Sequence, residues 1–598
     1  MIHPSVPGSL LLLISIFSCK TLSTQDPPSQ LFMQVPSEPR SNPLLATAEN
    51  EKNWSGIARI VSNQSCTAAF IAMESQLESP AYVITAGHCV MNLTDTTSSF
   101  MVYENALAPS NPNLINFRFF REKQERLEEQ LSVEKKQSQF HIGRVTYATM
   151  RGQDLAILEI TAEDSFPGIY RLMNRADQEP EDAALPFPKP VTVQMLKNIG
   201  IKPLRIADEI PEFGERIRII SAPVSNEEQS LDGYLQEHFC QHEGLASVAE
   251  HVWLWYNLAR NNCEDIFPGS SGAPILNARN ELFAIANTSS LNALSMDCYI
   301  GQPCEITDQG FQVAKNRSYG TVITWLRRCF DARGYLIPSL PACKLTSGHA
   351  LHVKSQTRTP INPLKMGAAD RFWAMEIEER SADRNGVRFK VGLAHKNDCR
   401  RAEGYSEVLP SHALGLRNLP LPTASGLYVL CLMSEADFVR KSWEKAIAVL
   451  ANIDATPPAL PAQLISDPVT QQPFMSVRKS CKNLPAQATL ELRKKCAVAV
   501  VSFELHPPEL VEFHFGWIGL NDKDCLHLRG EDAGLHASIP VNSLPAQLCV
   551  WGVDGAGNRA EKASIYAIRS ATRREIIEAT DVMADWSRLG SAPHTSLN

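Results

Sequence analysis

Residues 268–274 read Pro-Gly-Ser-Ser-Gly-Ala-Pro, and this stretch decides how the rest of the chain is interpreted. A serine framed by glycines at a tight turn exposes its hydroxyl and leaves backbone N–H groups free to face the same point. Upstream, residues 85–89 read Thr-Ala-Gly-His-Cys, and residues 152–158 read Gly-Gln-Asp-Leu-Ala-Ile-Leu. The histidine can act as the base for such a hydroxyl, and the aspartate can orient the histidine. The order His, Asp, Ser therefore predicts a nucleophilic triad.

The candidate members of this triad are His88, Asp154 and Ser271. Ser270 is a rival nucleophile by composition, but the Gly-x-Ser-Gly frame puts Ser271 in register. Two of the residues also have a plainer interpretation, in which Asp154 makes a local turn at the start of a strand and His88 is structural. The triad is favoured because each member has the neighbours that its role requires.

Length and composition indicate a globular protein of several domains. The chain has 598 residues, which at roughly 150 residues per domain suggests about four units. Hydrophobic residues make up 44% and charged residues 20%, which are ordinary values for proteins with sizeable cores. The net charge of −8 is weak for this length, and the sequence has no basic stripe. Nucleic acid is therefore not an expected partner.

The first 19 residues form a predicted signal peptide. Residues 10–17 are apolar but too short to span a bilayer as a helix. They lead to Cys19 in a pattern that resembles the lipobox of bacterial lipoproteins, which makes Cys19 a lipidation site; ordinary secretion with cleavage nearby is the alternative. Residues 20–50 are polar and proline-rich and form a predicted flexible tether. We expect an outer-membrane or cell-surface lipoprotein, or a secreted protein, with membrane contact only through the lipid.

Cysteine usage indicates export independently. The chain has 15 cysteines, and all of them except Cys19 fall into sequence-local couples. This pattern is typical of disulfides in an oxidising compartment. The couples are Cys66/Cys89, Cys240/Cys263, Cys298/Cys304, Cys329/Cys343, Cys399/Cys431, Cys481/Cys496 and Cys525/Cys549. Spacing alone leaves the connectivity open.

Short β runs dominate the first large segment, residues 51–337. Runs such as 58–61, 67–72 and 82–85 are separated by turn residues, which favours an antiparallel barrel or sandwich. Several prolines then mark residues 338–363 as a linker. The catalytic motifs all lie before this linker.

An internal repeat follows the linker. Residues 387–392 read Val-Arg-Phe-Lys-Val-Gly and return as Val-Glu-Phe-His-Phe-Gly at 511–516. Each copy continues with an Asp-Cys pair and a late apolar strand that carries a second cysteine, so we interpret residues 364–453 and 454–569 as a duplicated module. Period-2 alternation favours β-sandwiches, and the joints resemble those of bacterial immunoglobulin-like repeats. Residues 570–598 are expected to form a short helix and tail, with Ile576, Ala579, Met583 and Trp586 at helical spacing.

Residues 54 to about 335 resemble the chymotrypsin-like, or trypsin-like, serine peptidase family of bacterial type. The family motifs Thr-Ala-Ala-His-Cys, Asp-hydrophobic-Ala-Leu-Leu and Gly-Asp-Ser-Gly-Gly-Pro correspond to residues 85–89, 154–158 and 269–274. The resemblance implies two six-stranded antiparallel barrels with the active site in the cleft between them. The expected fold class is therefore all-β, with two barrels, two immunoglobulin-like sandwiches and a closing helix.

The same resemblance implies a role for each site residue. His88 is the general base, Asp154 fixes its tautomer, and Ser271 is the nucleophile. The backbone N–H groups of Gly269 and Ser271 form the oxyanion hole. The cysteine beside the catalytic histidine is habitually bridged to one on the preceding strand, which implies the bond Cys66–Cys89. The implied activity is hydrolysis of peptide bonds in protein or peptide substrates.

Specificity is predicted from positions around the nucleophile. Asp265 stands where trypsin-like members have the base of their primary pocket, which favours cleavage after Arg or Lys. Residues 282–289 match the strand that pairs with the substrate backbone, so Asn287, Thr288 and Ser289 are expected beside the cleft. Ser270 replaces the family aspartate of zymogen activation, and this form of the turn is closer to bacterial members, including glutamyl endopeptidases. Cleavage after Glu, or after apolar residues, therefore stays open.

Other chemistries and functions are also considered. His238 and His242 flank Cys240, but a bridged cysteine cannot bind a metal and no further ligand cluster is evident, so no metal and no cofactor are expected. The alternative function is a catalytically silent homologue that acts as a surface-binding or adhesion protein through its β-sandwich modules. In either case the modules have a possible surface ligand.

Overall fold

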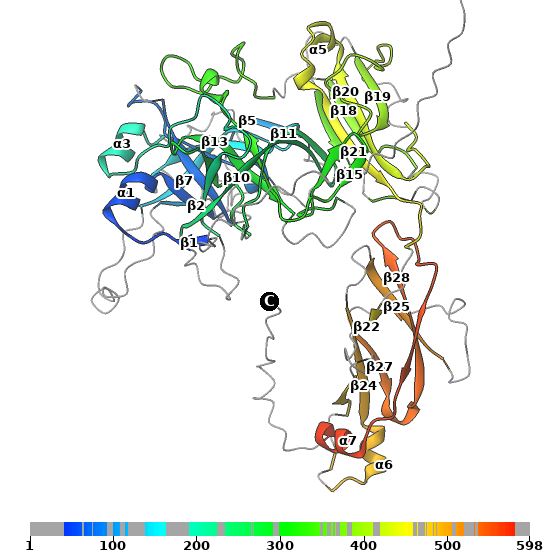
Figure 1. Cartoon of the computed structure of the whole chain (residues 1–598). Coiled ribbons are helices and arrows are strands. Elements are labelled where there is room, and N and C mark those ends of the chain that lie inside the picture. Colours follow the sequence, from blue (N-terminus) through cyan, green and yellow to red (C-terminus); the bar gives the residue numbers. More distant parts are fainter. Residues whose placement is uncertain are drawn as a thin grey trace, which may run out of the picture. The chain divides into compact units, whose positions relative to one another are not determined.

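A computed structural model of the chain gives its architecture, which is mostly β (Figure 1). It describes residues 41–580 except for 62–64, 74–75, 92–99, 108–113, 118–137, 163–189, 224–233, 265, 267, 291–297, 347–350, 356–359, 363–364, 366–370, 380–385, 411–418, 459–462, 465–472, 474, 482–483, 486, 505–509, 519–530 and 533–535. The predicted signal peptide, Cys19 and nearly all of the predicted tether lie outside the described residues.

The first part of the chain forms a closed six-stranded barrel. Its strands pair in the order β7-β6-β2-β3-β4-β8, and β8 pairs back onto β7, while β5 adds to the outer edge of β7. A continuous apolar run suits a strand that is buried on both faces, and all seven residues of β8 are buried. The strands are β2 (Ile57–Val61), β3 (Ser65–Ile71), β4 (Tyr82–Thr85), β5 (Val102–Leu107), β6 (Leu114–Phe117), β7 (Ser138–Thr149) and β8 (Leu155–Thr161).

A second circuit of six antiparallel strands follows. It pairs in the order β10-β9-β12-β13-β16-β11 and returns through β11 to β10, with β1, β14 and β15 at its edges. Its strands are β9 (Arg216–Ser221), β10 (Gln236–Glu250), β11 (Trp253–Asn261), β12 (Pro274–Leu276), β13 (Leu282–Ser289) and β16 (Ser318–Val322). The edge strands are β1 (Ser41–Pro43), β14 (Cys304–Thr307) and β15 (Gly310–Gln312). One apolar core joins both circuits, with Ile57 and Leu155 of the first packed in the same cluster as Ile220 and Leu282 of the second.

The first copy of the repeat extends the sheet of the second circuit. Strands β19 (Val387–Leu393), β20 (Gly426–Ser434) and β21 (Ile447–Ile453) pair in sequence, and β21 meets β11 at Val449 and Trp253. A separate hairpin joins β17 (Leu351–Ser355) to β18 (Met375–Glu379). The first copy, expected as a separate sandwich, therefore places its strands β19 to β21 in the sheet that carries β11, and β17 falls within the segment expected to be a linker.

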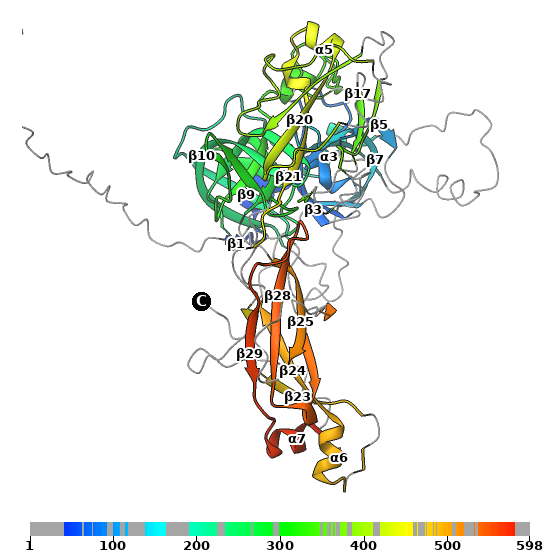
Figure 2. The ribbon, with the colours of Figure 1, turned by 90° about the vertical axis from the view of Figure 1, so that its right-hand side faces the viewer.

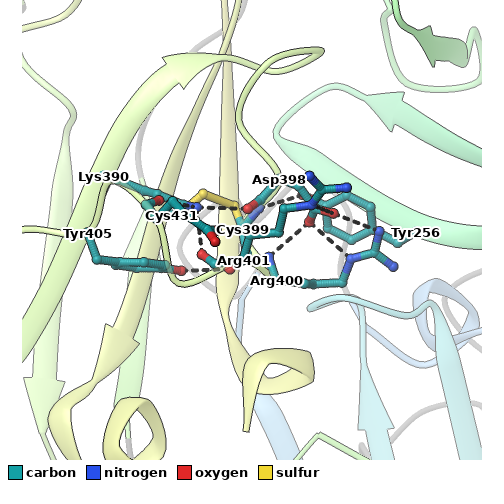
Figure 3. The surroundings of a disulfide bond; sticks show 9 residues. Tyr256, Lys390, Asp398, Cys399, Arg400, Arg401, Tyr405 and Cys431 are labelled. Atoms are coloured by element: carbon teal, nitrogen blue, oxygen red, sulfur yellow. Dashed lines mark hydrogen bonds and ion pairs between the residues drawn. A yellow bond between two sulfur atoms is a disulfide. The ribbon is translucent and has the colours of Figure 1, made fainter. Parts of the chain in front are cut away.

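The loop closed by the disulfide Cys399–Cys431 forms a second attachment of this copy to the second circuit (Figure 3). The guanidinium of Arg400 lies 4.0 Å from the ring centre of Tyr256 on β11, and the Cys399 N–H donates to the Tyr256 hydroxyl. Within the first copy, the Lys390 ammonium donates to the carbonyls of Asp398, Arg401 and Glu403. The contacts with Tyr256 hold the loop after β19 against the second circuit, and those of Lys390 hold the same loop against β19.

The second copy forms two four-stranded antiparallel sheets that share one core (Figure 2). The first sheet contains β22 (Gln463–Leu464), β23 (Met475–Lys479), β24 (Ala497–Glu504) and β27 (His536–Pro540). The second contains β25 (Leu510–Ile518), β26 (Glu531–Asp532), β28 (Ala546–Asp554) and β29 (Ser564–Ile568). Val501 of one sheet packs with Phe515 and Leu548 of the other.

Helices are few and short among the described residues. They are α1 (Ala48–Trp54), α3 (Val193–Asn198), α5 (Glu435–Val439), α6 (Leu490–Lys495) and α7 (Arg573–Thr580), with 3₁₀ turns η1 (Gly87–Cys89), η6 (Leu326–Cys329), η8 (Trp443–Lys445) and η9 (Val541–Ser543). Helix α7 lies in the segment expected to close the chain, and its Ile576 is buried. Met583 and Trp586 lie outside the described residues. No helix in the described segments is long and apolar enough to cross a membrane.

Six disulfide bonds join six of the expected cysteine couples. They are Cys66–Cys89, Cys240–Cys263, Cys298–Cys304, Cys329–Cys343, Cys399–Cys431 and Cys481–Cys496. Cys549 is also disulfide-bonded, while Cys525 lies outside the described residues. Disulfides in this number are consistent with an exported protein.

Candidate active site

The serine turn is shaped by two glycines in the left-handed region. Gly269 has φ +94° and Gly272 has φ +81°, conformations that side chains resist. A Cβ on Gly272 would also collide with the Thr85 hydroxyl and the Thr67 carbonyl. The turn is therefore possible only with glycine at position 272, as the sequence supplies.

Hydrogen bonds to both circuits fix this turn in place. The Thr67 N–H on β3 donates to the Ser271 carbonyl at 2.8 Å, and the Thr67 hydroxyl donates to the Gly269 carbonyl at 2.8 Å. On the other side, the Gly272 N–H donates to the Ala286 carbonyl of β13 at 2.8 Å. Within the described part of the chain, the N–H groups of Gly269 and Ser271 donate to no other group.

The two adjacent serines differ in their surroundings. Ser270 is 1% exposed, and its Oγ has no hydrogen-bond partner among the described residues. Ser271 is only partly buried. Both line the same cavity, and Ser271 is the more exposed of the two.

His88 and Asp154 meet at the end of the first barrel. His88 lies in η1, directly after β4, and Asp154 stands immediately before β8. The His88 Nδ1 and the Asp154 Oδ2 are 2.6 Å apart, and the His88 N–H donates to Asp154 Oδ1 at 2.8 Å. Asp154 is fully buried, and its carbonyl accepts from the Thr321 hydroxyl of β16 at 3.0 Å. With Nδ1 directed at Asp154, Nε2 is the ring nitrogen that can take up a proton.

A departure from the family motif is explained by this contact. Position 87 is glycine where the family has alanine. A Cβ on Gly87 would collide with the Thr149 carbonyl and lie 2.9 Å from Asp154 Oδ1. The missing side chain therefore makes room for the close approach of Asp154 to His88.

The His88 imidazole is basic for a buried group. Burial lowers its pKa, but the charge of Asp154, the hydrogen bond to Asp154 and the charge of Glu250 together raise the pKa above the ordinary value. The charged form of His88 is thus stabilised, which is what a base that accepts a proton during a reaction requires.

A cavity of about 280 Å³ holds the reactive groups. His88 and Ser271 line it together with Asn287, Thr288 and Ser289 of β13, the residues expected beside the cleft. Asp265, the predicted pocket base, lies outside the described residues.

Three lining residues had no signal in the sequence. Glu250 is the last residue of β10, and Trp253 and Trp255 lie on β11. All three line the cavity. No motif surrounds them, because their position depends on how the β10–β11 hairpin pairs with other strands. A composition or spacing argument could not have found them.

The candidate metal ligands make other contacts. His238 Nε2 is 3.1 Å from the Ser221 hydroxyl, and His242 packs edge-on against Phe283. Among the described residues, Cys66, His88 and Cys89 are close enough to share an ion. Because both cysteines are consumed by a disulfide, that group offers no thiolate ligand.

No family model and no curated protein matches the chain. Among solved structures, it is similar to a Glu endopeptidase, with 15% identity and TM-score 0.23 over 48% of this chain and 92% of that one. It is also similar to the MamO protease domain from Magnetospirillum magneticum, with 11% identity and TM-score 0.24 over 45% and 92%. Human heparin binding protein matches with 13% identity and TM-score 0.23 over 46% and 90%. At these scores, activity must be inferred from the chain's own residues.

Proposed function

We propose that the chain is an exported serine endopeptidase that cleaves peptide bonds through an acyl-enzyme. The observation that carries this proposal is the hydrogen-bonded pair of His88 and Asp154 in one cavity with Ser271. The Ser271 oxygen attacks the carbonyl carbon of the scissile bond while His88 takes up its proton. His88 then donates that proton to the departing amine, and water hydrolyses the ester.

Two further features suit the same reaction. The N–H groups of Gly269 and Ser271, which donate to no backbone carbonyl among the described residues, would stabilise the negative oxygen of the tetrahedral intermediate. Strand β13, with Asn287, Thr288 and Ser289 at the cavity, would pair with the substrate backbone. We further propose that the two strand circuits are the two barrels of the chymotrypsin-like fold, which would place the reaction between them.

Specificity is a finer proposal. Asp265 would form the base of the primary pocket and select Arg or Lys by a charge-assisted hydrogen bond. The competing outcomes are cleavage after Glu or after apolar residues. A peptide-library cleavage profile of wild-type protein and Asp265→Ser distinguishes them, because only the first predicts a basic preference that the substitution removes.

Location and the modules belong to the proposal as well. Lipid on Cys19, or plain secretion, would deliver the enzyme to the cell exterior, and mass spectrometry of the mature N-terminus separates the two. The second repeat copy would be an immunoglobulin-like module that acts as a spacer or adhesion unit for a surface ligand, whereas the first copy extends the sheet of the second circuit. Binding of a peptide substrate at the cavity is not expected to depend on such a ligand.

A fluorophosphonate probe tests the catalytic proposal directly. Wild-type protein should be labelled at Ser271, faster as pH rises, because His88 must be neutral and its pKa lies above its ordinary value. Ser271→Ala should abolish labelling and lower peptide hydrolysis by about a million-fold, since the triad acts as a unit. Ser270→Ala is the matched control and should still be labelled. Absence of labelling in wild-type protein would instead support the catalytically silent, surface-binding alternative.

A further inference from the structure

Glu250 carries the only carboxylate among the described residues that line the cavity of His88 and Ser271. It is 6% exposed. Its Oε1 accepts the Gly301 N–H at 2.7 Å, while Oε2 has no hydrogen-bond partner among the described residues. Burial raises the pKa of this carboxyl above its ordinary value, although the Gly301 N–H and the Thr288 side chain oppose that shift. A buried carboxylate with an unused oxygen is costly unless a ligand completes its pairing.

The walls beside this carboxylate are aromatic and apolar. The rings of Trp253 and Trp255 stack with centroids 5.8 Å apart and planes 10° apart, and both line the cavity with Ile266 and Ile300. A lysine or arginine side chain has a long aliphatic stem and a charged end, and aromatic faces attract such cations. The combination of one acid and two tryptophans therefore fits a basic side chain.

Glu250 is held in position before any ligand arrives. The disulfide Cys298–Cys304 closes a short loop that presents Ile300 and Gly301 to the cavity. This loop is fixed to β10 at both ends, because Cys304 pairs with Ala249 and the His251 N–H donates to the Cys298 carbonyl. A preorganised acceptor binds without paying for rearrangement, which favours selectivity.

The charges that face Glu250 come from the triad itself. Among charged groups, His88 lowers the pKa of Glu250 and Asp154 raises it, and with burial as the largest cause the pKa lies above its ordinary value. Of the described lining residues, His88 is the only one whose side chain can carry positive charge. A cation from a substrate would thus supply the charge that this carboxylate lacks.

We propose that Glu250 is a specificity-determining residue that binds a lysine or arginine side chain of the substrate. Its carboxylate pairs with the cation, and Trp253 and Trp255 cover the aliphatic stem. The basic residue lies before the scissile bond, because the β13 residues proposed to pair with that part of the substrate line the same cavity. This inference rests on the proposed endopeptidase function and is separate from the proposal for Asp265.

A positional peptide library tests the inference on catalysis. Glu250→Gln keeps an oxygen for the Gly301 N–H and removes the charge. It should lower the preference for Lys or Arg over norleucine, measured as a ratio of kcat/KM, by about 100-fold at one position before the scissile bond. Glu237→Gln on the same strand is the matched control, since Glu237 pairs with Arg218 away from the cavity, and it should keep the preference. No basic preference in wild-type protein, or its persistence in Glu250→Gln, would overturn the inference.

A binding measurement keeps the two proposals apart. Fluorescence titration with the cation p-aminobenzamidine, in the Ser271→Ala background, needs no catalysis. Adding Glu250→Gln should weaken binding by about 100-fold, whereas adding Glu237→Gln should not. Binding that depends on Glu250 without probe labelling of wild-type protein would refute the endopeptidase but keep the cation site. Labelling without any dependence on Glu250, in either assay, would refute the cation site alone.

Discussion

The two copies of the repeat have similar sequences but bury their strands against different partners. In the first copy, Leu430 and Val449 belong to the same apolar core as Trp253 and Trp255 of the cavity wall. In the second copy, Leu548 and its neighbours pack on the opposing sheet of the same module. The first copy therefore supports the wall of the candidate active site, and the second is built as a unit with its own core.

This difference shows that a repeat seen in sequence does not fix what each copy does. The backbone of β21 reaches the hairpin of the second circuit, where the Leu450 N–H donates to the Val252 carbonyl at 2.9 Å. Val252 lies between Glu250 and Trp253, which both line the cavity. Substitutions in the first copy are thus expected to change activity, while matched substitutions in the second are expected to change only its own stability.

The largest effect is expected at Arg151, which lies shortly before Asp154. Its side chain joins this part of the first barrel to two segments that follow the second circuit. Its guanidinium is buried and donates to the carbonyls of Leu351 at 2.9 Å and Lys445 at 3.0 Å. Burial lowers its pKa to about 10, so it remains charged at neutral pH. Arg151→Met leaves both carbonyls without their donors and should cost about 3 kcal/mol in the free energy of unfolding.

Activity should fall with this loss, because Met150 and Asp154 on either side contribute to the site. Urea unfolding and kcat/KM measure the two effects, and at least a tenfold loss of kcat/KM is expected. Arg559→Met in the second copy is the matched control: Arg559 stacks on Trp551 at 4.2 Å, and kcat/KM should stay within twofold. Equal losses from both substitutions would show that the copies do not differ in the way proposed.

Much of the site follows from local sequence. The positive φ angles of Gly269 and Gly272 are what a Gly-x-Ser-Gly turn predicts, since other residues resist them. The pairing of His88 with Asp154, which are 66 residues apart, could be expected from the order of the motifs and from the family resemblance, but not from local spacing. The role of Gly87 could not be predicted, since it depends on where the Thr149 carbonyl comes to lie.

The fold could be predicted as β but not in its longer-range pairings. Alternating residues indicate strands wherever they occur, so β19 and β20 of the first copy were expected. Nothing in the sequence shows that Val449 meets Trp253, because edge pairing between distant strands depends on backbone groups that every residue carries. The support that the first copy gives to the cavity wall is therefore visible only in the structure.

Matched positions of the repeat give a prediction of intermediate size. Lys390 and His514 occupy the same place in the two copies. Lys390 is buried, donates to three carbonyls of the loop after β19 and lies over the Tyr405 ring (Figure 3). His514 stacks on Trp551, with the ring centres 6.1 Å apart.

Lys390→Met should therefore cost about 2 kcal/mol, because a charged donor to buried carbonyls is lost. It should also lower kcat/KM severalfold, through the loop whose Arg400 stacks on Tyr256 of β11. His514→Met should not alter kcat/KM, because the second copy packs on its own core. Thermal unfolding and steady-state kinetics of both variants test this difference. A larger loss of kcat/KM from His514→Met than from Lys390→Met would reverse the comparison.

The smallest effect concerns Asp398, whose carboxylate pairs with Arg400 at 3.0 Å through both oxygens. Although burial raises the pKa of Asp398, the hydrogen bonds and charges of Arg400 lower it below the ordinary value overall. A depressed pKa means that the pair stabilises the fold above the unfolded pKa, and that this contribution is lost as pH falls through the native pKa. Because the pair is partly exposed, we expect about 0.5 kcal/mol at neutral pH. Urea unfolding of wild-type protein and Asp398→Asn should show this gap at pH 7, and the gap should shrink as pH falls through the native pKa of Asp398. A gap that persists in acid would mean that Asp398 acts through its backbone turn, and that charge does not help attach the first copy to Tyr256.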